Sequence, residues 1–138
     1  ADVSSESDIE RVVETALRRS GRIEGLVNNA AIGPLGTVLD TAPDLWDRIM
    51  AVNLRGPYLM ARAVFPHMAA QGGGSVVNVG SGSGWGKPNM AAYSASKAAI
   101  IALTRSLQEE LGAHGVRANA VVPTTIDTPA NRAAMPNA

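Results

Sequence analysis

Three short apolar segments, separated by long helical patterns, restrict the folds open to this chain more than any other feature. They cover residues 23–28, 75–79 and 116–122. Unbroken apolar strands are typical of a parallel sheet that helices cover on both faces, whereas half-exposed strands alternate apolar and polar residues. Because strands alternate with helices along the chain, the sequence predicts an α/β fold built on a parallel sheet.

Helical patterns fill most of the chain between these segments. The expected helices cover residues 4–20, 41–70 and 91–111. Ser4 or Ser5 can cap the first helix. Pro57 should kink the second helix, because proline removes a backbone donor and clashes with the preceding turn. Ahead of the first helix, residues 1–3 resemble the end of a further strand.

Charge and cysteine content restrict the class of partner. The chain has 138 residues, with 12 Lys and Arg against 12 Asp and Glu, so no basic surplus indicates nucleic acid or an anionic membrane surface. No apolar run approaches membrane-spanning length. The absence of cysteine excludes disulfides and thiolate zinc sites, and no metal site is expected. It also suits a reducing compartment, so a cytoplasmic location is expected.

A Gly-Ser-Gly-Ser-Gly tract at residues 80–84 allows three interpretations: a flexible linker, a phosphate cradle, or one wall of an active site. A linker is disfavoured because the tract joins a strand to a helix inside one unit. The glycine spacing fits neither dinucleotide-binding nor P-loop motifs, and Lys87 precedes Pro88 rather than Ser or Thr. Ligands of parallel α/β sheets bind beyond the carboxyl ends of the strands, which favours the active-site wall.

Tyr93 and Lys97 lie four residues apart, and therefore on one face of the expected helix. A phenol titrates near pH ~10 in water and is a poor base at neutral pH. A nearby cation favours the phenolate, so the two side chains together form a workable acid/base pair.

Five motifs occur in one order along nearly the whole chain: LVNNAAI at 26–32, VNLRG at 52–56, VVNVGSGSGW at 76–85, YSASK at 93–97 and VRANAVVP at 116–123. With these motifs, the chain resembles the short-chain dehydrogenase/reductase superfamily, in its compact single-domain branch. The resemblance implies a partial doubly wound, Rossmann-like parallel sheet, with the three apolar segments as strands four to six. Residues 1–138 would form the central and catalytic part of one dinucleotide-binding domain.

The resemblance implies four catalytic residues for an NAD(P)-dependent oxidoreductase that interconverts a small-molecule alcohol and a carbonyl. Tyr93 would be the acid/base, and Lys97 would favour its phenolate and bind the nicotinamide ribose. Ser81 would hydrogen-bond the substrate oxygen. Asn53 would hold a water that relays protons to Lys97.

The resemblance also implies contacts to NAD or NADP from three segments. Asp2 and Val3 would contact adenine, and residues 29–31 (Asn29, Ala30, Ala31) would line the adenosine side. A last segment would contact the nicotinamide carboxamide through Pro123, Ile126 and Thr128. Tyr93 and Lys97 would also touch the cofactor.

Structural roles remain open for some of these residues. Asn53 could satisfy a strained carbonyl near Pro57, residues 28–29 could be ordinary turn asparagines, and Thr128 could only cap a helix before Pro129.

The motifs depart from the family pattern at three places. Ala31 and Thr124 stand where the family usually has glycine. The interval between the catalytic serine and Tyr93 is one residue shorter than usual. Because the preceding strand, which contains Asn78, fixes the start of the loop, we favour Ser81 and keep Ser83 as the alternative.

The family's Thr-Gly-x-x-x-Gly-x-Gly turn does not occur in the sequence. We therefore expect an internal fragment of a longer oxidoreductase that lacks the N-terminal glycine-rich turn and the C-terminal part. Such a fragment should be inactive alone, whereas the complete protein should be a homodimer or homotetramer. The alternative is a non-catalytic chain that only self-associates.

Overall fold

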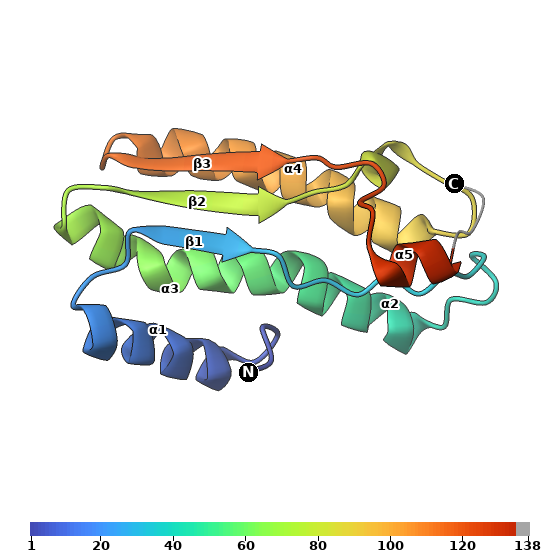
Figure 1. The fold of residues 1–138 in the computed structure, drawn as a ribbon, viewed down its shortest axis with the longest axis horizontal. Helices are drawn as coiled ribbons and strands as arrows, with labels where there is room; N and C mark the ends of the chain where they lie inside the picture. Colours follow the sequence, from blue (N-terminus) through green and yellow to red (C-terminus); the bar gives the residue numbers. More distant parts are fainter. Residues whose placement is uncertain (135–138) are drawn as a thin grey trace.

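A parallel sheet organises the computed structural model, which describes residues 1–134 (Figure 1). Its strands are β1 (Gly25–Asn28), β2 (Gly74–Val79) and β3 (Val116–Val121), in the order β1-β2-β3. Leu26 pairs in register with Val76, which pairs with Ala118. The predicted α/β fold with a parallel sheet is confirmed.

Helices connect these strands. The α-helices are α1 (Glu6–Ser20), α2 (Pro43–Met50), α3 (Gly56–Ala70), α4 (Ala91–Gly112) and α5 (Pro129–Ala134). A π-helical turn, η1 (Ala51–Arg55), joins α2 to α3, and a 3-10 turn, η2 (Gly82–Trp85), follows β2. None of the described helices is both long enough and apolar enough to cross a membrane.

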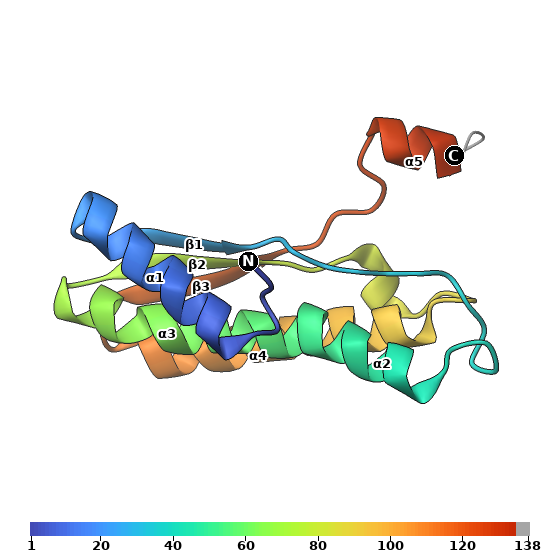
Figure 2. The same cartoon turned by 90° about the horizontal axis from the view of Figure 1, so that it is seen from below.

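Helices α2, α3 and α4 lie on one side of the sheet, and α1 runs beside the edge strand β1 and packs on α3, while α5 stands away from the strands on the other side (Figures 1 and 2). The predicted cover on both faces is therefore wrong for the described residues, and Val27 is 65% exposed. The strand order explains the difference. It advances in one direction, so right-handed crossovers place both connections on the same face. Cover on the second face requires a reversal of strand order.

The hydrophobic core lies between the inner face of the sheet and helices α3 and α4. Val76, Val116 and Met68 are fully buried. Around them pack apolar residues from both layers, including Leu26, Val64, Leu107, Leu111 and Ala118. This layer holds α4, which carries the Tyr-x-x-x-Lys motif, rigidly against the strands.

The chain before α1 forms a turn, so the expected strand end at residues 1–3 is wrong. The Asp2 carboxylate accepts hydrogen bonds from the amide and the hydroxyl of Ser4, at 2.8 and 2.7 Å. Such local bonds from aspartate favour turns over strands. Of the two predicted caps, Ser5 is the N-cap of α1, and its hydroxyl accepts a hydrogen bond from the Asp8 amide.

The helix changes type just before Pro57, where the sequence predicts a kink. The π-helical turn η1 comes directly before it, and the Gly56 amide donates to the carbonyl of Ala51, five residues back. A π-turn widens the helix locally, which accommodates a proline that has no amide proton and needs room for its ring. The predicted long helix is thus divided into α2, η1 and α3, and it places Asn53 inside the π-turn.

Candidate active site

The carboxyl ends of all three strands point to one edge of the sheet (Figure 1). The loop after β1, the turn η2 after β2 and the first turns of α4 lie at this edge, and α4 packs against both η1 and η2. This is the position at which parallel α/β sheets bind ligands.

The Gly-Ser tract is tied into this edge by backbone hydrogen bonds. The Gly80 amide donates to the carbonyl of Val121 and the Gly82 amide to that of Pro123, both at 2.8 Å. A Cβ on Gly84 would lie 3.1 Å from the backbone nitrogen of Ala98, so the glycine allows η2 to pack closely on α4. These contacts contradict the linker interpretation.

Lys97 is a buried charged residue of the site, and it is held by a hydrogen bond. Its side chain is only 3% exposed, and its Nζ donates a hydrogen bond to the carbonyl of Val79 at 2.7 Å. The same Nζ lies 5.7 Å from the ring centroid of Tyr93, within cation–π range. Burial lowers the pKa of the Lys97 ammonium from its ordinary value of 10.5. The structure therefore brings the predicted acid/base pair together on one face of α4.

The lowered pKa of Lys97 predicts a pH-dependent stability. As pH rises toward 10.5, Lys97 loses its proton in the folded state at a lower pH than in the unfolded state. The free energy of unfolding should therefore rise with pH over this range. Lys97→Met should flatten this rise, whereas Lys87→Met, at an exposed lysine, controls for the loss of one cation. Urea denaturation at a series of pH values measures both. Equal pH slopes for wild type and Lys97→Met would contradict the assignment.

Asn53 holds the loop after β1 against the helices. It is 1% exposed; its Oδ1 accepts from the Ile32 amide at 2.9 Å, and its Nδ2 donates to the Ile32 carbonyl at 2.8 Å. Nδ2 also donates to Ser96 Oγ at 3.0 Å, and Ser96 Oγ donates to the Tyr93 carbonyl at 2.7 Å. The alternative role, in which Asn53 satisfies a carbonyl near Pro57, does not match these contacts. Sequence reasoning missed Ser96.

Ser81 and Ser83 occupy different places in η2. Ser81 is the N-cap of the turn and is 8% exposed, and its Oγ accepts from the Ser83 amide at 3.1 Å. Ser83 lies within the turn and is half-buried. Trp85, at the end of η2, is 79% exposed. The choice of catalytic serine remains a prediction.

Residues predicted to contact the adenosine come together from distant parts of the chain. A small hollow of ≈70 Å³ is lined by Val3, Asn29 and Ala30, among others. Ala31 follows on the same loop and is exposed.

The segment predicted to contact the nicotinamide is organised mainly by bonds within itself. Thr128 Oγ1 accepts from the Asn131 amide at 3.1 Å, so Thr128 caps the short helix α5, as the structural alternative proposed. Asn131 also donates to the Ile126 carbonyl, and Ile126 is 55% exposed. Pro123 is the exception, because its carbonyl binds Gly82 in the Gly-Ser tract.

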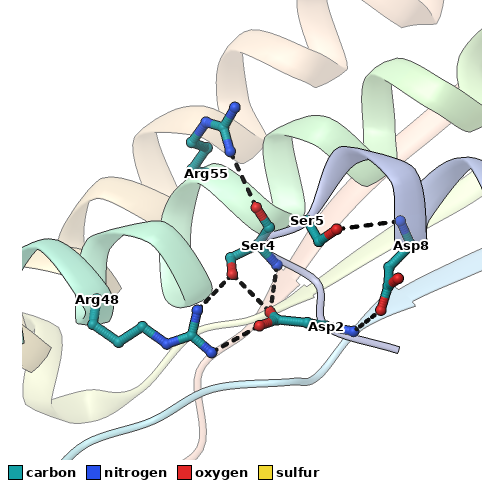
Figure 3. Close-up of polar contacts among 6 residues, drawn as sticks. All are labelled: Asp2, Ser4, Ser5, Asp8, Arg48 and Arg55. Atoms are coloured by element: carbon teal, nitrogen blue, oxygen red, sulfur yellow. Dashed lines mark hydrogen bonds and ion pairs between the residues drawn. The ribbon is translucent and has the colours of Figure 1, made fainter.

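The carboxylate of Asp2, predicted to contact adenine, already has protein partners (Figure 3). Besides Ser4, it accepts from Arg48 at 2.9 Å. The Ser4 hydroxyl and amide, followed by the Arg48 guanidinium, hold the pKa of Asp2 well below its usual range. Arg55 adds a hydrogen bond to the Ser4 carbonyl at 3.2 Å. Sequence reasoning missed Arg48, which lies 46 residues from Asp2 and carries no local signal.

A buried polar chain links β1, β2 and α4. Asn28 Nδ2 donates to Asn78 Oδ1, and Asn78 Nδ2 donates to Thr104 Oγ1, both at 2.8 Å. Asn28 is thus a sheet residue rather than an ordinary turn asparagine. The signal was visible in the sequence, because an asparagine inside an apolar strand needs a buried partner.

The fold and the position of the site define a protein with a Rossmann-like fold, and comparisons with known proteins agree. The family model for "short chain dehydrogenase" matches residues 1–138. The chain is 44% identical over 127 residues to 2-(S)-hydroxypropyl-CoM dehydrogenase 3 of Xanthobacter autotrophicus, covering 91% of this chain and 50% of that protein. The chain belongs to the short-chain dehydrogenase family.

Solved structures show the same architecture. NAD+-bound xylitol dehydrogenase superposes with a TM-score of 0.88 at 37% identity, over 93% of this chain and 50% of that one. Gluconate 5-dehydrogenase of Burkholderia cenocepacia, in complex with NADP and tartrate, gives 0.91 at 33% identity, over 100% and 55%. The chain therefore spans about half the length of the relatives it matches.

Proposed function

We propose that this chain supplies the catalytic residues of an NAD(P)-dependent oxidoreductase that interconverts an alcohol and a carbonyl. One observation carries the proposal: Tyr93 and the buried ammonium of Lys97 share one face of α4 at the carboxyl edge of the parallel sheet. The names and bound cofactors of the similar dehydrogenases support the same reaction class.

The roles of the residues follow from their chemistry. When bound, the nicotinamide supplies or accepts the hydride. In reduction, the Tyr93 hydroxyl gives its proton to the carbonyl oxygen as the new C–H bond forms; in oxidation, the phenolate removes the alcohol proton. Lys97 stabilises the phenolate by its charge. One N–H of the Lys97 ammonium donates a hydrogen bond to the Val79 carbonyl, and the other two can donate to ribose hydroxyls.

Asn53 and Ser81 complete the proposed site. Asn53 fixes the loop after β1 through Ile32 and couples it to the backbone of Tyr93 through Ser96. Its side-chain oxygen and nitrogen are both engaged with protein, so a water that relays protons to Lys97 would be held by its backbone. Ser81 would donate a hydrogen bond to the substrate oxygen.

The turnover of alanine variants distinguishes Ser81 from Ser83 as the catalytic serine. In a longer protein containing this chain, Ser81→Ala should lower turnover by about 100-fold, the low end of the effect of one positioned hydrogen-bond donor. Ser83→Ala, two residues away in the same turn, is the matched control and should stay near wild type. Steady-state carbonyl reduction, followed through the absorbance of the reduced nicotinamide, measures both. A larger loss for Ser83→Ala moves the catalytic role to Ser83.

A further inference from the structure

Gly33, directly after the loop residue bound by Asn53, lies against the ring of Tyr93. A Cβ on Gly33 would lie 2.7 Å from Cδ2 and 2.9 Å from Cε2 of that ring. Carbon atoms in favourable contact are about 3.5–4.0 Å apart, so no side chain fits between them. The φ angle of Gly33 is not positive, and the backbone therefore does not require glycine here. The space taken by the Tyr93 ring is the reason that glycine is needed.

A chain of hydrogen bonds also connects the loop that contains Gly33 to the backbone of Tyr93. Ile32, the neighbour of Gly33, is held through both its amide and its carbonyl by Asn53. Asn53 binds Ser96, and Ser96 binds the backbone of Tyr93. These bonds close a ring that runs from Gly33 through Ile32, Asn53 and Ser96 to Tyr93. A larger residue at position 33 cannot be absorbed by the loop without breaking that ring, so the Tyr93 side chain must move.

We propose that Gly33 is a positioning residue for Tyr93. By lacking a Cβ, it admits the ring and determines where the phenol oxygen lies relative to Lys97 and the substrate. The inference rests on the proposed acid/base role of Tyr93. Neither the Tyr-x-x-x-Lys motif nor the Asn-Asn-Ala motif contains this position.

The functional test is a double-mutant cycle in a longer, active protein that contains this chain. Gly33→Ala should lower kcat by about 100-fold, because a displacement of roughly 1 Å at a reacting group has this effect. The KM for the nicotinamide cofactor should change little. In the Tyr93→Phe background, the same substitution should add almost nothing, since the displaced oxygen is already absent.

Gly36→Ala is the matched control. It lies in the same loop, and its Cβ would meet only the Thr41 hydroxyl at 3.4 Å and the Asp40 Cβ at 3.7 Å. Its turnover should remain near wild type. An unchanged kcat for Gly33→Ala would overturn the inference, as would equal losses in the wild-type and Tyr93→Phe backgrounds. Near-normal turnover of Tyr93→Phe alone would overturn the proposed function as well.

The contact itself can be tested without activity. In the NMR spectrum of the 138-residue chain, the Gly33 Hα protons should be displaced by the ring current of Tyr93. Tyr93→Leu should return them toward ordinary glycine shifts, while Tyr58→Leu, at the other tyrosine, should leave them in place. Ordinary Gly33 shifts in the wild-type chain would show that the ring lies elsewhere. That result would overturn the inference and leave the proposed function standing.

Discussion

Tyr93→Phe is expected to lower turnover about 100-fold or more in a longer protein that contains this chain, because it removes the proposed proton donor. The ring would keep its place on Gly33, and the Lys97 ammonium would keep its hydrogen bond to Val79. Cofactor binding should therefore survive while chemistry fails. A fall in kcat with an unchanged KM for the cofactor is the expected pattern.

The chain provides its own control for this variant. Tyr58 is the only other tyrosine and is 47% exposed in the first turn of α3. Tyr58→Phe removes the same hydroxyl and should leave turnover unchanged. Thermal unfolding of both variants separates a catalytic loss from a folding defect. Near-normal rates for a folded Tyr93→Phe protein would remove Tyr93 from the mechanism.

Local patterns in the sequence were sufficient to predict the strands and the proximity of Tyr93 and Lys97. The strands were visible because each apolar run is continuous, and the four-residue spacing of Tyr93 and Lys97 places both on one helix face. The bare second face of the sheet depends instead on strand order and crossover handedness, which no local pattern encodes. A prediction of cover from strand composition alone was therefore wrong for the described residues.

The contacts that sequence reasoning missed are long-range. Arg48 reaches Asp2 over 46 residues, and Gly33 meets Tyr93 only because Asn53 draws the loop after β1 against the helices. A glycine in a loop is usually interpreted through its backbone freedom, yet here the space it leaves is what matters. Such a role becomes visible only once the fold has placed an aromatic ring beside it.

The 138-residue chain by itself is expected to bind NADH and NADPH weakly, with dissociation constants on the order of 1 mM or above. The hollow beside Asn29 and Ala30 is ≈70 Å³, whereas pockets for ligands of this size are about 300–1,000 Å³. Family members bind the pyrophosphate at a glycine-rich turn that begins a helix, and the Thr-Gly-x-x-x-Gly-x-Gly turn does not occur in this sequence. Without a pyrophosphate site, only the predicted contacts to the adenosine, the ribose and the nicotinamide would remain.

Titration calorimetry and quenching of tryptophan fluorescence measure this affinity directly. Trp85 borders the Gly-Ser tract and is 79% exposed, so Trp85→Phe identifies which tryptophan reports on binding. The edge strand β1 exposes Val27 and has β2 as its only partner among the described strands, which favours association with other chains. Sedimentation must therefore accompany the titration, because pairing at this edge could alter fluorescence without any cofactor. Affinity on the order of 1 µM for either dinucleotide, in a monomeric sample, would contradict this expectation. It would show that backbone amides within the 138-residue chain already form a pyrophosphate site.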